Sequence, residues 1–371
     1  MLSAHSNGAP QGSPGETRQA IRRCVFAGLG GIGQRHLRNL RALLGDSVEV
    51  VAYRVRRERQ TLDDSLQVVP GVDLEREYGV RVCTDLDEAL SERPDVVFIT
   101  NPSSLHVPIA LEAARRGCHL FIEKPLSHSL EQVSELAALC DAQGLVTCVA
   151  YQLRYHPGFL RLRELLAENA IGKVLSVRAE VGEYLPGFHP YEDYRRMYAS
   201  NSALGGGVTL SQIHEIDFLC ALFGAPRRVF SMGGHVSSLE VDVDDLSLSL
   251  LEFARADGSP LFVELHQDFV QRPGQRSTTV IGERGKIVWS LSGRFLEHVD
   301  ESGRSLDRQD YTQFPRNRAF VDGLANFLGC VIRGEACTPS LREGALSLEV
   351  AVALLASQAD GTQKLIQTRM P

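Results

Sequence analysis

The sequence has no apolar run close to the ~20 consecutive residues that a membrane-spanning helix needs. It also has no C-x-x-C pair. Its 8 cysteines are scattered, and several stand inside apolar stretches, which favours reduced, buried thiols in the cytoplasm over a disulfide framework or a metal site. Basic residues are also outnumbered by acidic ones, 39 to 46. The formal net charge of -7 argues against a nucleic-acid surface, which needs a basic face.

The N-terminus lacks the apolar core of a signal peptide and is rich in Ser, Gly and Pro, so we expect a disordered tail over residues 1–20. No internal repeat is visible. The length of 371 residues suggests two domains, and a hydrophobic content of 43% is ordinary for a soluble globular enzyme.

A glycine-rich turn organises the first part of the chain. An apolar run at 24–27 precedes Gly28, Gly30 and Gly33, which have G-x-G-x-x-G spacing, and residues 37–44 carry apolar side chains at helical spacing. Strand, turn and helix thus come in the order that a dinucleotide site requires, with the diphosphate at the helix N-terminus. We interpret the turn, including Gly31 and Ile32, as a dinucleotide-binding turn and not as an ordinary loop.

The end of the next strand bears on the choice of cofactor. Residues 48–53 form an apolar run, and Arg54 follows with three more arginines within five residues, whereas 53–57 contain no carboxylate. A carboxylate here would bind the adenine ribose, and an arginine accommodates a 2′-phosphate. The pattern favours NADP, with NAD as the alternative. A basic turn that is merely exposed to solvent, without a role in cofactor binding, also explains the arginines.

Strands and helices alternate up to residue 150. Residues 60–79 read as a polar loop, and Pro102 forces Asn101 out of the helical region, so a loop follows the strand at 95–99. This alternation predicts a parallel sheet with helices on both faces. The further strands expected are 80–83, 118–122 and 145–150, and the helices are 85–90, one around 109–114, and 129–143.

The pattern changes at Tyr151, after which strands dominate and an antiparallel sheet with one covered face is expected. The expected strands are 173–185, 228–236, 246–253, 261–270, 278–280 and 286–291, and the expected helices are 209–222, 317–333 and 340–358.

The ordered motifs resemble the Gfo/Idh/MocA family of sugar and cyclitol oxidoreductases. The segments that carry the resemblance are Gly28–Gly33, Asn101-Pro102 with His106, Glu123-Lys124-Pro125, 151–157, the triple glycine 205–207 followed by His214, and 282–286. Their order holds from about residue 21 to the C-terminal helices.

The resemblance implies an α/β architecture. A Rossmann domain with a doubly wound parallel sheet would span 21–150, and a C-terminal α/β domain with a large open, mostly antiparallel sheet would span 151–371. It further implies hydride transfer between NAD(P) and a carbinol or keto carbon of a sugar, amino sugar, nucleotide-sugar or cyclitol. It implies a homo-oligomer, dimer or tetramer, formed through the C-terminal sheet. A cofactor-binding regulator without turnover is the alternative, because the family contains such proteins.

The resemblance also implies roles for two residues. Lys124, at a strand end, would hydrogen-bond the reacting hydroxyl and transfer its proton as the hydride moves; the alternative is an exposed lysine that opens a helix. A cis peptide bond is expected between Lys124 and Pro125. His214 would exchange a proton with the sugar, and Asp217, on the same helical face, would orient the imidazole or form a salt bridge.

The sequence departs from the family pattern before the histidine. Many members carry an aspartate three or four residues earlier, where this chain has Ser211 and Leu210. Either Lys124 and His214 suffice, or Tyr184 or Glu215 substitutes, or activity on common family substrates is lost.

The remaining site residues follow from the same resemblance. Arg154 would contact cofactor or substrate, or would instead form a domain-interface salt bridge. The cofactor set comprises Gly28, Gly30, Gly31, Ile32, Gly33, Arg54, Thr100, Asn101, Pro102, His106, Glu123, Lys124 and Arg154. The substrate set comprises Lys124, Arg154, Tyr184, His189, Tyr194, Ser211 and His214.

Overall fold

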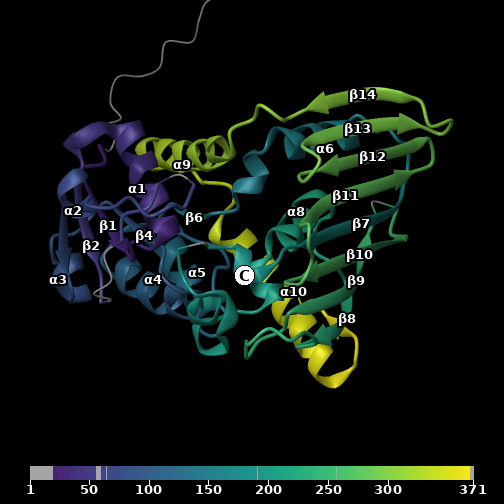
Figure 1. Ribbon diagram of the computed structural model, residues 1–371. Helices are drawn as coiled ribbons and strands as arrows, with labels where there is room; N and C mark the ends of the chain where they lie inside the picture. The colour runs from purple at the N-terminus through teal and green to yellow at the C-terminus, as the bar shows by residue number, and fades with distance from the viewer. Residues whose placement is uncertain (1–19, 56–59, 64, 190, 256, 368–371) are drawn as a thin grey trace, which may run out of the picture.

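The computed structural model describes residues 20–55, 60–63, 65–189, 191–255 and 257–367. These residues form two sheets that lie side by side, with helices packed between them and around the first sheet (Figure 1). Within the described ranges, no helix is long and apolar enough to cross a lipid bilayer.

The first sheet has six parallel strands in the order β3-β2-β1-β4-β5-β6, as expected for a Rossmann fold. The strand order reverses between β1 and β4, and the carboxyl ends of these strands therefore leave a crevice where ligands bind in such folds. The strands are β1 (Arg23–Ala27), β2 (Glu49–Tyr53), β3 (Val80–Cys83), β4 (Val96–Ile99), β5 (His119–Ile122) and β6 (Thr147–Val149).

Helices cover both faces of this sheet, which is why its strands are continuous apolar runs. Phe26 of β1 packs in one cluster with Leu37 of the first helix, and the next residue, Ala27, packs in another with Val107. The helices are α1 (Gly31–Leu44), α2 (Leu74–Glu77), α3 (Leu86–Ser91), α4 (His106–Arg115) and α5 (Val133–Ala142).

One helix from the far end of the chain also packs against the first sheet. Helix α9 (Arg316–Arg333) contributes Leu324, Phe327 and Val331 to the cluster that contains Phe26. The rings of Phe327 and Phe121 have centroids 5.4 Å apart. A division at residue 150 therefore separates the two sheets, but it also separates α9 from the apolar cluster of the first sheet in which α9 packs. The tail expected at 1–20 lies outside the described residues, apart from residue 20.

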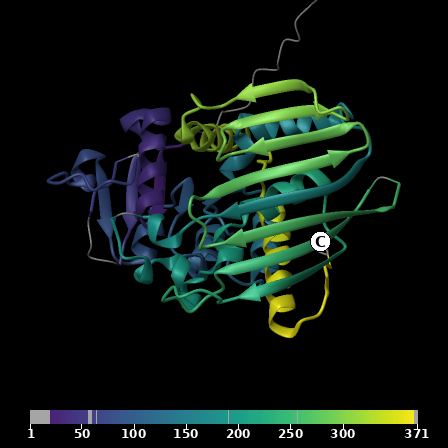
Figure 2. The same cartoon turned by 45° about the vertical axis from the view of Figure 1, so that its right-hand side comes forward.

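The second sheet has nine strands in the order β14-β13-β12-β11-β7-β10-β9-β8-β15 (Figure 2). Only the β7–β10 pair is parallel. The strands are β7 (Val174–Gly182), β8 (Arg228–Gly234), β9 (Leu246–Ala254), β10 (Pro260–Asp268), β11 (Gln275–Gly282), β12 (Gly285–Ser290), β13 (Phe295–Asp300), β14 (Ser305–Asp310) and β15 (Lys364–Leu365).

Helices α6 (Pro157–Ala167), α8 (His214–Phe223) and α10 (Leu341–Asp360) cover one face of this sheet. The other face is open. Along β9, Leu251 is 1% exposed, whereas its neighbour Leu250 is 58% exposed. The sequence analysis missed α6, β13, β14 and β15. Strand β14 is polar and largely exposed, so no apolar alternation marks it.

The helix expected at 209–222 is broken in two, which corrects that prediction. Helix α7 (Val208–Ser211) ends at Gln212, and α8 begins at His214. The Gln212 backbone carbonyl accepts a hydrogen bond from the Gln267 side chain, and the side-chain amide of Gln212 donates to the Asp268 backbone carbonyl. These bonds to β10 fix the backbone at the break and set the start of α8 at His214.

Candidate active site

The glycine turn after β1 has the geometry that a dinucleotide needs. Gly28 has φ +99°, and a Cβ there would lie 3.1 Å from the Asn101 backbone nitrogen. A Cβ on Gly33 would lie 2.6 Å from the Gly28 carbonyl oxygen, whereas one on Gly30 would meet nothing within 4 Å. The first and third glycines thus permit close packing, and the second leaves open space where a diphosphate can approach the backbone.

The loop after β4 borders this turn. The Thr100 hydroxyl donates to the Gly28 carbonyl over 2.7 Å, and Asn101 Oδ1 is buried without a hydrogen-bond partner among the described residues. The buried His106 ring lies 2.8 Å from the Asn101 carbonyl oxygen and 2.9 Å from that of Pro125. His106 therefore joins two loops, and Asn101 has a free polar atom for a ligand. Pro102 opens the short helix at Ser103–Leu105.

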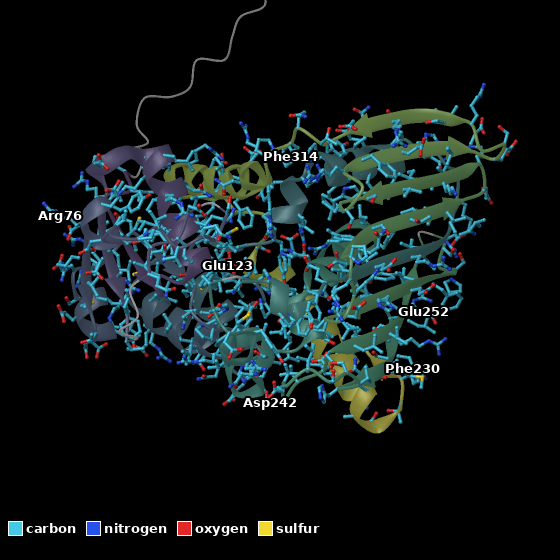
Figure 3. All side chains as sticks on the ribbon, viewed as in Figure 1. Arg76, Glu123, Phe230, Asp242, Glu252 and Phe314 are labelled. Carbon is cyan, nitrogen blue, oxygen red and sulfur yellow. The ribbon has the colours of Figure 1, made fainter. Side chains whose placement is uncertain are left out.

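The Glu123-Lys124-Pro125 segment follows β5, and its Lys124-Pro125 peptide bond is cis, which confirms that expectation. Glu123 lies between the two sheets (Figure 3). One of its oxygens is 2.7 Å from His36 Nε2 on α1, and the other accepts the Lys124 backbone N–H over 3.1 Å. The Glu123 carboxylate therefore anchors this segment to α1.

Lys124 reaches across to the second domain. Its Nζ donates to the Ser211 carbonyl oxygen over 2.8 Å, at the end of α7 and three residues before His214. The Ser211 hydroxyl and His214 Nδ1 are both buried and have no hydrogen-bond partner among the described residues. An amine, a hydroxyl and an imidazole are thus gathered at one place with hydrogen-bonding capacity to spare.

His214 is surrounded by positive charge. Burial, together with the charges of Lys124, Arg276 and Arg316, lowers the pKa of His214 well below its usual value. Its ring packs edge-on against Tyr151, with centroids 5.8 Å apart. The imidazole is therefore neutral at physiological pH, a state in which one ring nitrogen can donate a hydrogen bond and the other can accept one.

Arg276 is a site residue that the sequence analysis missed. From β11 it donates to both oxygens of the buried Glu215, over 2.6 and 2.8 Å. Burial raises the pKa of Glu215, although the paired guanidinium opposes that rise. No motif surrounds Arg276 in the sequence, and only the fold places it near His214.

Arg154 and Asp217 are occupied by each other. The guanidinium donates to Asp217 over 2.8 and 2.7 Å and also pairs with Glu343 of α10. Burial raises the pKa of Asp217 to about 6, against the pull of Arg154. These contacts engage the Arg154 guanidinium in salt bridges within the C-terminal domain, and they show Asp217 in a salt bridge, one of the two roles expected for it.

The side chains of the polar segment after β7 make contacts with several different partners. Tyr184 packs beneath Arg272, whose guanidinium carbon lies 4.1 Å from the ring centroid. His189 stacks on Tyr191 with centroids 5.2 Å apart, and the Tyr194 hydroxyl accepts the Glu240 backbone N–H over 3.3 Å. Tyr194 therefore makes its hydrogen bond on the side of Glu240, and no described contact joins it to Lys124.

The arginine at the end of β2 has a carboxylate neighbour from a separate helix. Arg54 Nη1 lies 3.4 Å from a carboxylate oxygen of Glu75, which comes from α2. The exposed fraction of both side chains is small, at 10% and 18%. A carboxylate from a separate helix therefore pairs with the first of the four arginines. Arg56, Arg57 and Arg59 lie outside the described residues.

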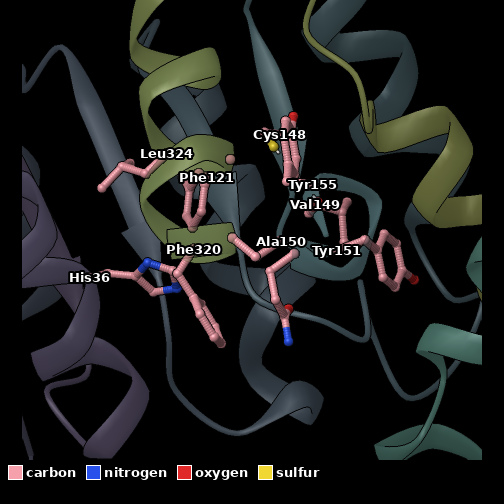
Figure 4. Close-up of a pocket in the computed structure, with 12 residues that line it drawn as sticks. His36, Phe121, Cys148, Val149, Ala150, Tyr151, Tyr155, Phe320 and Leu324 are labelled. Atoms are coloured by element: carbon pink, nitrogen blue, oxygen red, sulfur yellow. Dashed lines mark hydrogen bonds between the residues drawn. The ribbon is translucent and has the colours of Figure 1, made fainter. Parts of the chain in front are cut away.

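A small crevice lies between β6 and α9 (Figure 4). Its largest lining side chains are Phe121, Tyr151, Tyr155 and Phe320, with His36 at one end. It includes neither Lys124 nor His214 among its lining residues, so it is not the candidate site. The described residues contain no group of three or more His, Cys, Asp or Glu side chains that could hold a metal ion.

Comparison with family models matches both parts of the chain. Residues 22–151 match the model of the oxidoreductase family with an NAD-binding Rossmann fold, and residues 159–288 match the GFO/IDH/MocA C-terminal domain. The scyllo-inositol 2-dehydrogenase (NAD(+)) of Bacillus subtilis is 25% identical over 351 residues, which are 91% of this chain and 94% of that protein. The levoglucosan dehydrogenase of Pseudarthrobacter phenanthrenivorans is 26% identical over 64% of this chain and 66% of its own length.

Solved structures share the fold. A levoglucosan dehydrogenase in complex with NADH superposes with a TM-score of 0.77 at 19% identity, covering 93% of this chain and 99% of that one. GenD2 from gentamicin A biosynthesis, in complex with NAD, gives 0.73 at 25% identity over 96% and 100% of the two chains. From the two family models together with the fold, this chain belongs to the Gfo/Idh/MocA family of oxidoreductases.

Proposed function

We propose that the protein is an NAD-dependent dehydrogenase that acts on a carbinol carbon of a sugar or cyclitol, in free or nucleotide-linked form. One observation carries the proposal. The Lys124 amine contacts the Ser211 carbonyl beside the carboxyl edge of the Rossmann sheet, and its charge acts on the neutral His214 imidazole. The Ser211 hydroxyl and His214 Nδ1 are buried and have no hydrogen-bond partner among the described residues. The relatives named levoglucosan dehydrogenase and scyllo-inositol 2-dehydrogenase support the substrate class.

The residues divide the work by chemistry. The nicotinamide, when bound, accepts or supplies the hydride. Lys124 hydrogen-bonds the reacting hydroxyl and, with its amine deprotonated, takes that hydroxyl's proton. Its Nζ contacts the Ser211 carbonyl and has no carboxylate partner among the described residues. His214 is neutral and has an unsatisfied nitrogen, so it binds a neighbouring sugar hydroxyl.

The direct test is a substrate panel. NAD(H)-linked turnover should be measured against sugars, amino sugars, cyclitols and nucleotide-linked sugars, together with their keto forms. We expect turnover with at least one class. If the protein binds cofactor tightly but turns over none of the panel, the proposal fails, and the alternative of a cofactor-binding regulator is favoured.

The choice of NAD over NADP rests on Glu75. Its carboxylate pairs with Arg54 at the end of β2, the strand end at which a carboxylate binds the adenine ribose in dinucleotide folds. This reverses the preference inferred from the arginines alone. The two solved structures compared above are complexes with NADH and with NAD.

Dissociation constants for NADH and NADPH test this choice. We expect NADH to bind more tightly to the wild-type protein. Glu75→Gln should shift the preference towards NADPH by about tenfold or more, because each charge-assisted contact contributes on the order of 1.5–3 kcal/mol. Tighter binding of NADPH to the unaltered protein would restore the earlier inference.

We also propose that the open face of the second sheet joins two copies of the chain. It carries large apolar side chains from three adjacent strands: Met232, Leu248, Leu250 and Phe262 are 46–64% exposed. Contiguous apolar patches of this kind mark interaction surfaces. Size-exclusion chromatography with light scattering should give a dimer or a larger assembly for the wild-type protein and a monomer for Leu250→Glu. Glu264→Gln, on the same face, is the matched control.

A further inference from the structure

The first turn of α8 buries three ionisable side chains. His214, Glu215 and Asp217 have exposed fractions of 4%, 1% and 1%. Glutamate and aspartate are rarely buried to this extent unless they are paired, and the desolvation of a buried ion pair can exceed the gain from its attraction. Burial of these two carboxylates is therefore weak evidence of added stability, and it points to another role.

Each carboxylate is held by an arginine from a different element. Arg276 of β11 donates from Nε and Nη2 to the two oxygens of Glu215, over 2.6 and 2.8 Å. Arg154, from the short helix Gln152–Tyr155, makes the same bidentate contact with Asp217. Two hydrogen bonds from one planar guanidinium fix direction as well as distance. Both contacts therefore restrain the rotation of α8 about its own axis.

His214 lies between these two restraints. With roughly 3.6 residues per turn, Glu215 stands about 100° from His214 around the helix, and Asp217 about 60° to the other side. Ile216, on the far side of the same turn, is fully buried in the main apolar cluster. The helix begins without a side-chain cap, so these contacts orient its first turn together with the bonds of Gln212 to β10.

Arg276 is itself held on a rigid element. Its strand, β11, pairs with β7 on one side and β12 on the other. The Arg276 backbone N–H donates to the Ser292 hydroxyl over 2.6 Å, and its carbonyl accepts the Leu291 N–H over 2.9 Å. Supporting residues on strands position a site more precisely than residues on loops. The Arg276 guanidinium is thus a fixed point against which the start of α8 is aligned.

We propose that Arg276 is a positioning residue, which holds the His214 imidazole in its binding orientation by fixing Glu215, the next residue of α8. The inference rests on the proposed function, in which His214 binds a hydroxyl of the sugar. Both Glu215 oxygens accept hydrogen bonds from Arg276. Glu215 therefore acts through this pair and does not substitute for the aspartate that the sequence lacks at 210 and 211.

The test is steady-state kinetics of the full-length protein with the best substrate of the panel. Arg276→Lys keeps the positive charge but cannot form the bidentate contact with Glu215. We expect the KM for the sugar to rise by about threefold to tenfold, as for the loss of one neutral hydrogen bond. The kcat and the dissociation constant for NADH should stay within about twofold of wild type. Arg308→Lys is the matched control, because that exposed arginine pairs with Glu297 in the same sheet, and its KM should not change.

A second background separates positioning from direct contact with the sugar. If Arg276 acts through His214, Arg276→Lys should raise KM no further in a His214→Ala protein. Losses that multiply in the combined variant would place Arg276 on the sugar itself and overturn the inference. The double variant Glu215→Gln, Arg276→Gln leaves no buried charge unpaired, and it should raise KM as Arg276→Lys does. Thermal unfolding confirms that each variant is folded.

Two further results bear on the inference. Equal KM in wild type and Arg276→Lys would overturn it and leave the proposed function standing. Equal losses of NADH binding and sugar binding would also overturn it, because they indicate a general disturbance of the fold. A wild-type protein that turns over no member of the panel gives a separate result, since it overturns the proposed function and with it the role of His214.

Discussion

The two halves of the candidate site are built in different ways. The cofactor half is a single short turn, Gly28 to Gly33, whose backbone shape follows from its own glycines and from one neighbouring loop. The proposed substrate half brings together Lys124 from the end of β5, His214 from the start of α8, and Arg276 from β11. The first half depends on local geometry, and the second depends on the correct docking of two domains.

This difference bears on how each half can change. A local turn tolerates changes elsewhere, because its function needs only backbone N–H groups and space. An assembled site responds to any change that moves one domain against the other, such as loss of the contact between Lys124 and the Ser211 carbonyl. We therefore expect cofactor binding and turnover to separate cleanly in variants, and four predictions test this separation.

The largest effect is expected for Lys124→Met. Loss of a general acid–base group typically reduces turnover by about 10²–10⁴-fold, and the cofactor half of the site is left intact. Steady-state kinetics should show this loss, while the dissociation constant for NADH stays within about threefold. Lys173→Met is the control, because that lysine is exposed and pairs only with Asp257 among the described residues. Equal turnover in Lys124→Met and wild type would remove the lysine from the mechanism.

The second prediction affects only the cofactor half. Gly30→Val fills the open space above the turn, so two charge-assisted hydrogen bonds to the diphosphate are lost, each contributing on the order of 1.5–3 kcal/mol. Calorimetry should show NADH binding weakened by on the order of 10²-fold or more, with a thermal unfolding curve close to that of wild type. An unaltered dissociation constant would mean that the diphosphate does not bind at this turn.

The third prediction concerns pH and the substrate half. The folded-state pKa of His214 is well below its unfolded value of ~6.5, so below that pH the unfolded chain binds a proton that the folded protein does not. This residue's contribution to stability is thus complete above pH ~6.5 and declines as the pH falls, with a limiting slope of about 1.4 kcal/mol per pH unit.

Urea unfolding of wild type and His214→Gln between pH 7.5 and 5.5 measures this contribution. The free energy of unfolding should fall more steeply with decreasing pH in the wild-type protein. Parallel curves for the two proteins would mean that the histidine is not held neutral by its surroundings.

The smallest effect is expected for Ser211→Asp, which restores a carboxylate three residues before His214. A negative charge near the Lys124 ammonium stabilises its charged form, so the pH of half-maximal oxidation should rise by about one unit. Leu210→Asp is the comparison, because Leu210 is buried at 4% exposure in the main apolar cluster and an aspartate there should destabilise the fold. A pH–rate profile that does not move in Ser211→Asp would place the new carboxylate away from the amine.

The sequence predicted the two sheets and the cofactor turn because both follow from local patterns. Apolar runs alternate with helical spacing up to residue 150, and the three glycines stand in one turn. The sequence could not predict the pairing of Arg54 with Glu75, because the partners come from separate elements and the arginine cluster suggested a different role. The position of Arg276 was missed for the same physical reason: it comes from tertiary packing, and nothing in the adjacent sequence indicates it.

The position of α9 has a consequence for how the chain folds during synthesis. Phe26 and Phe121 are in place once the first 150 residues have been made, but Phe327 and Val331, which cover them, are translated about half a chain later. Until then, one apolar face of the nascent Rossmann sheet is without part of its cover. The first domain therefore completes its core only after residue 331 has been made, and a fragment that stops at residue 150 would expose a surface that associates with other apolar surfaces.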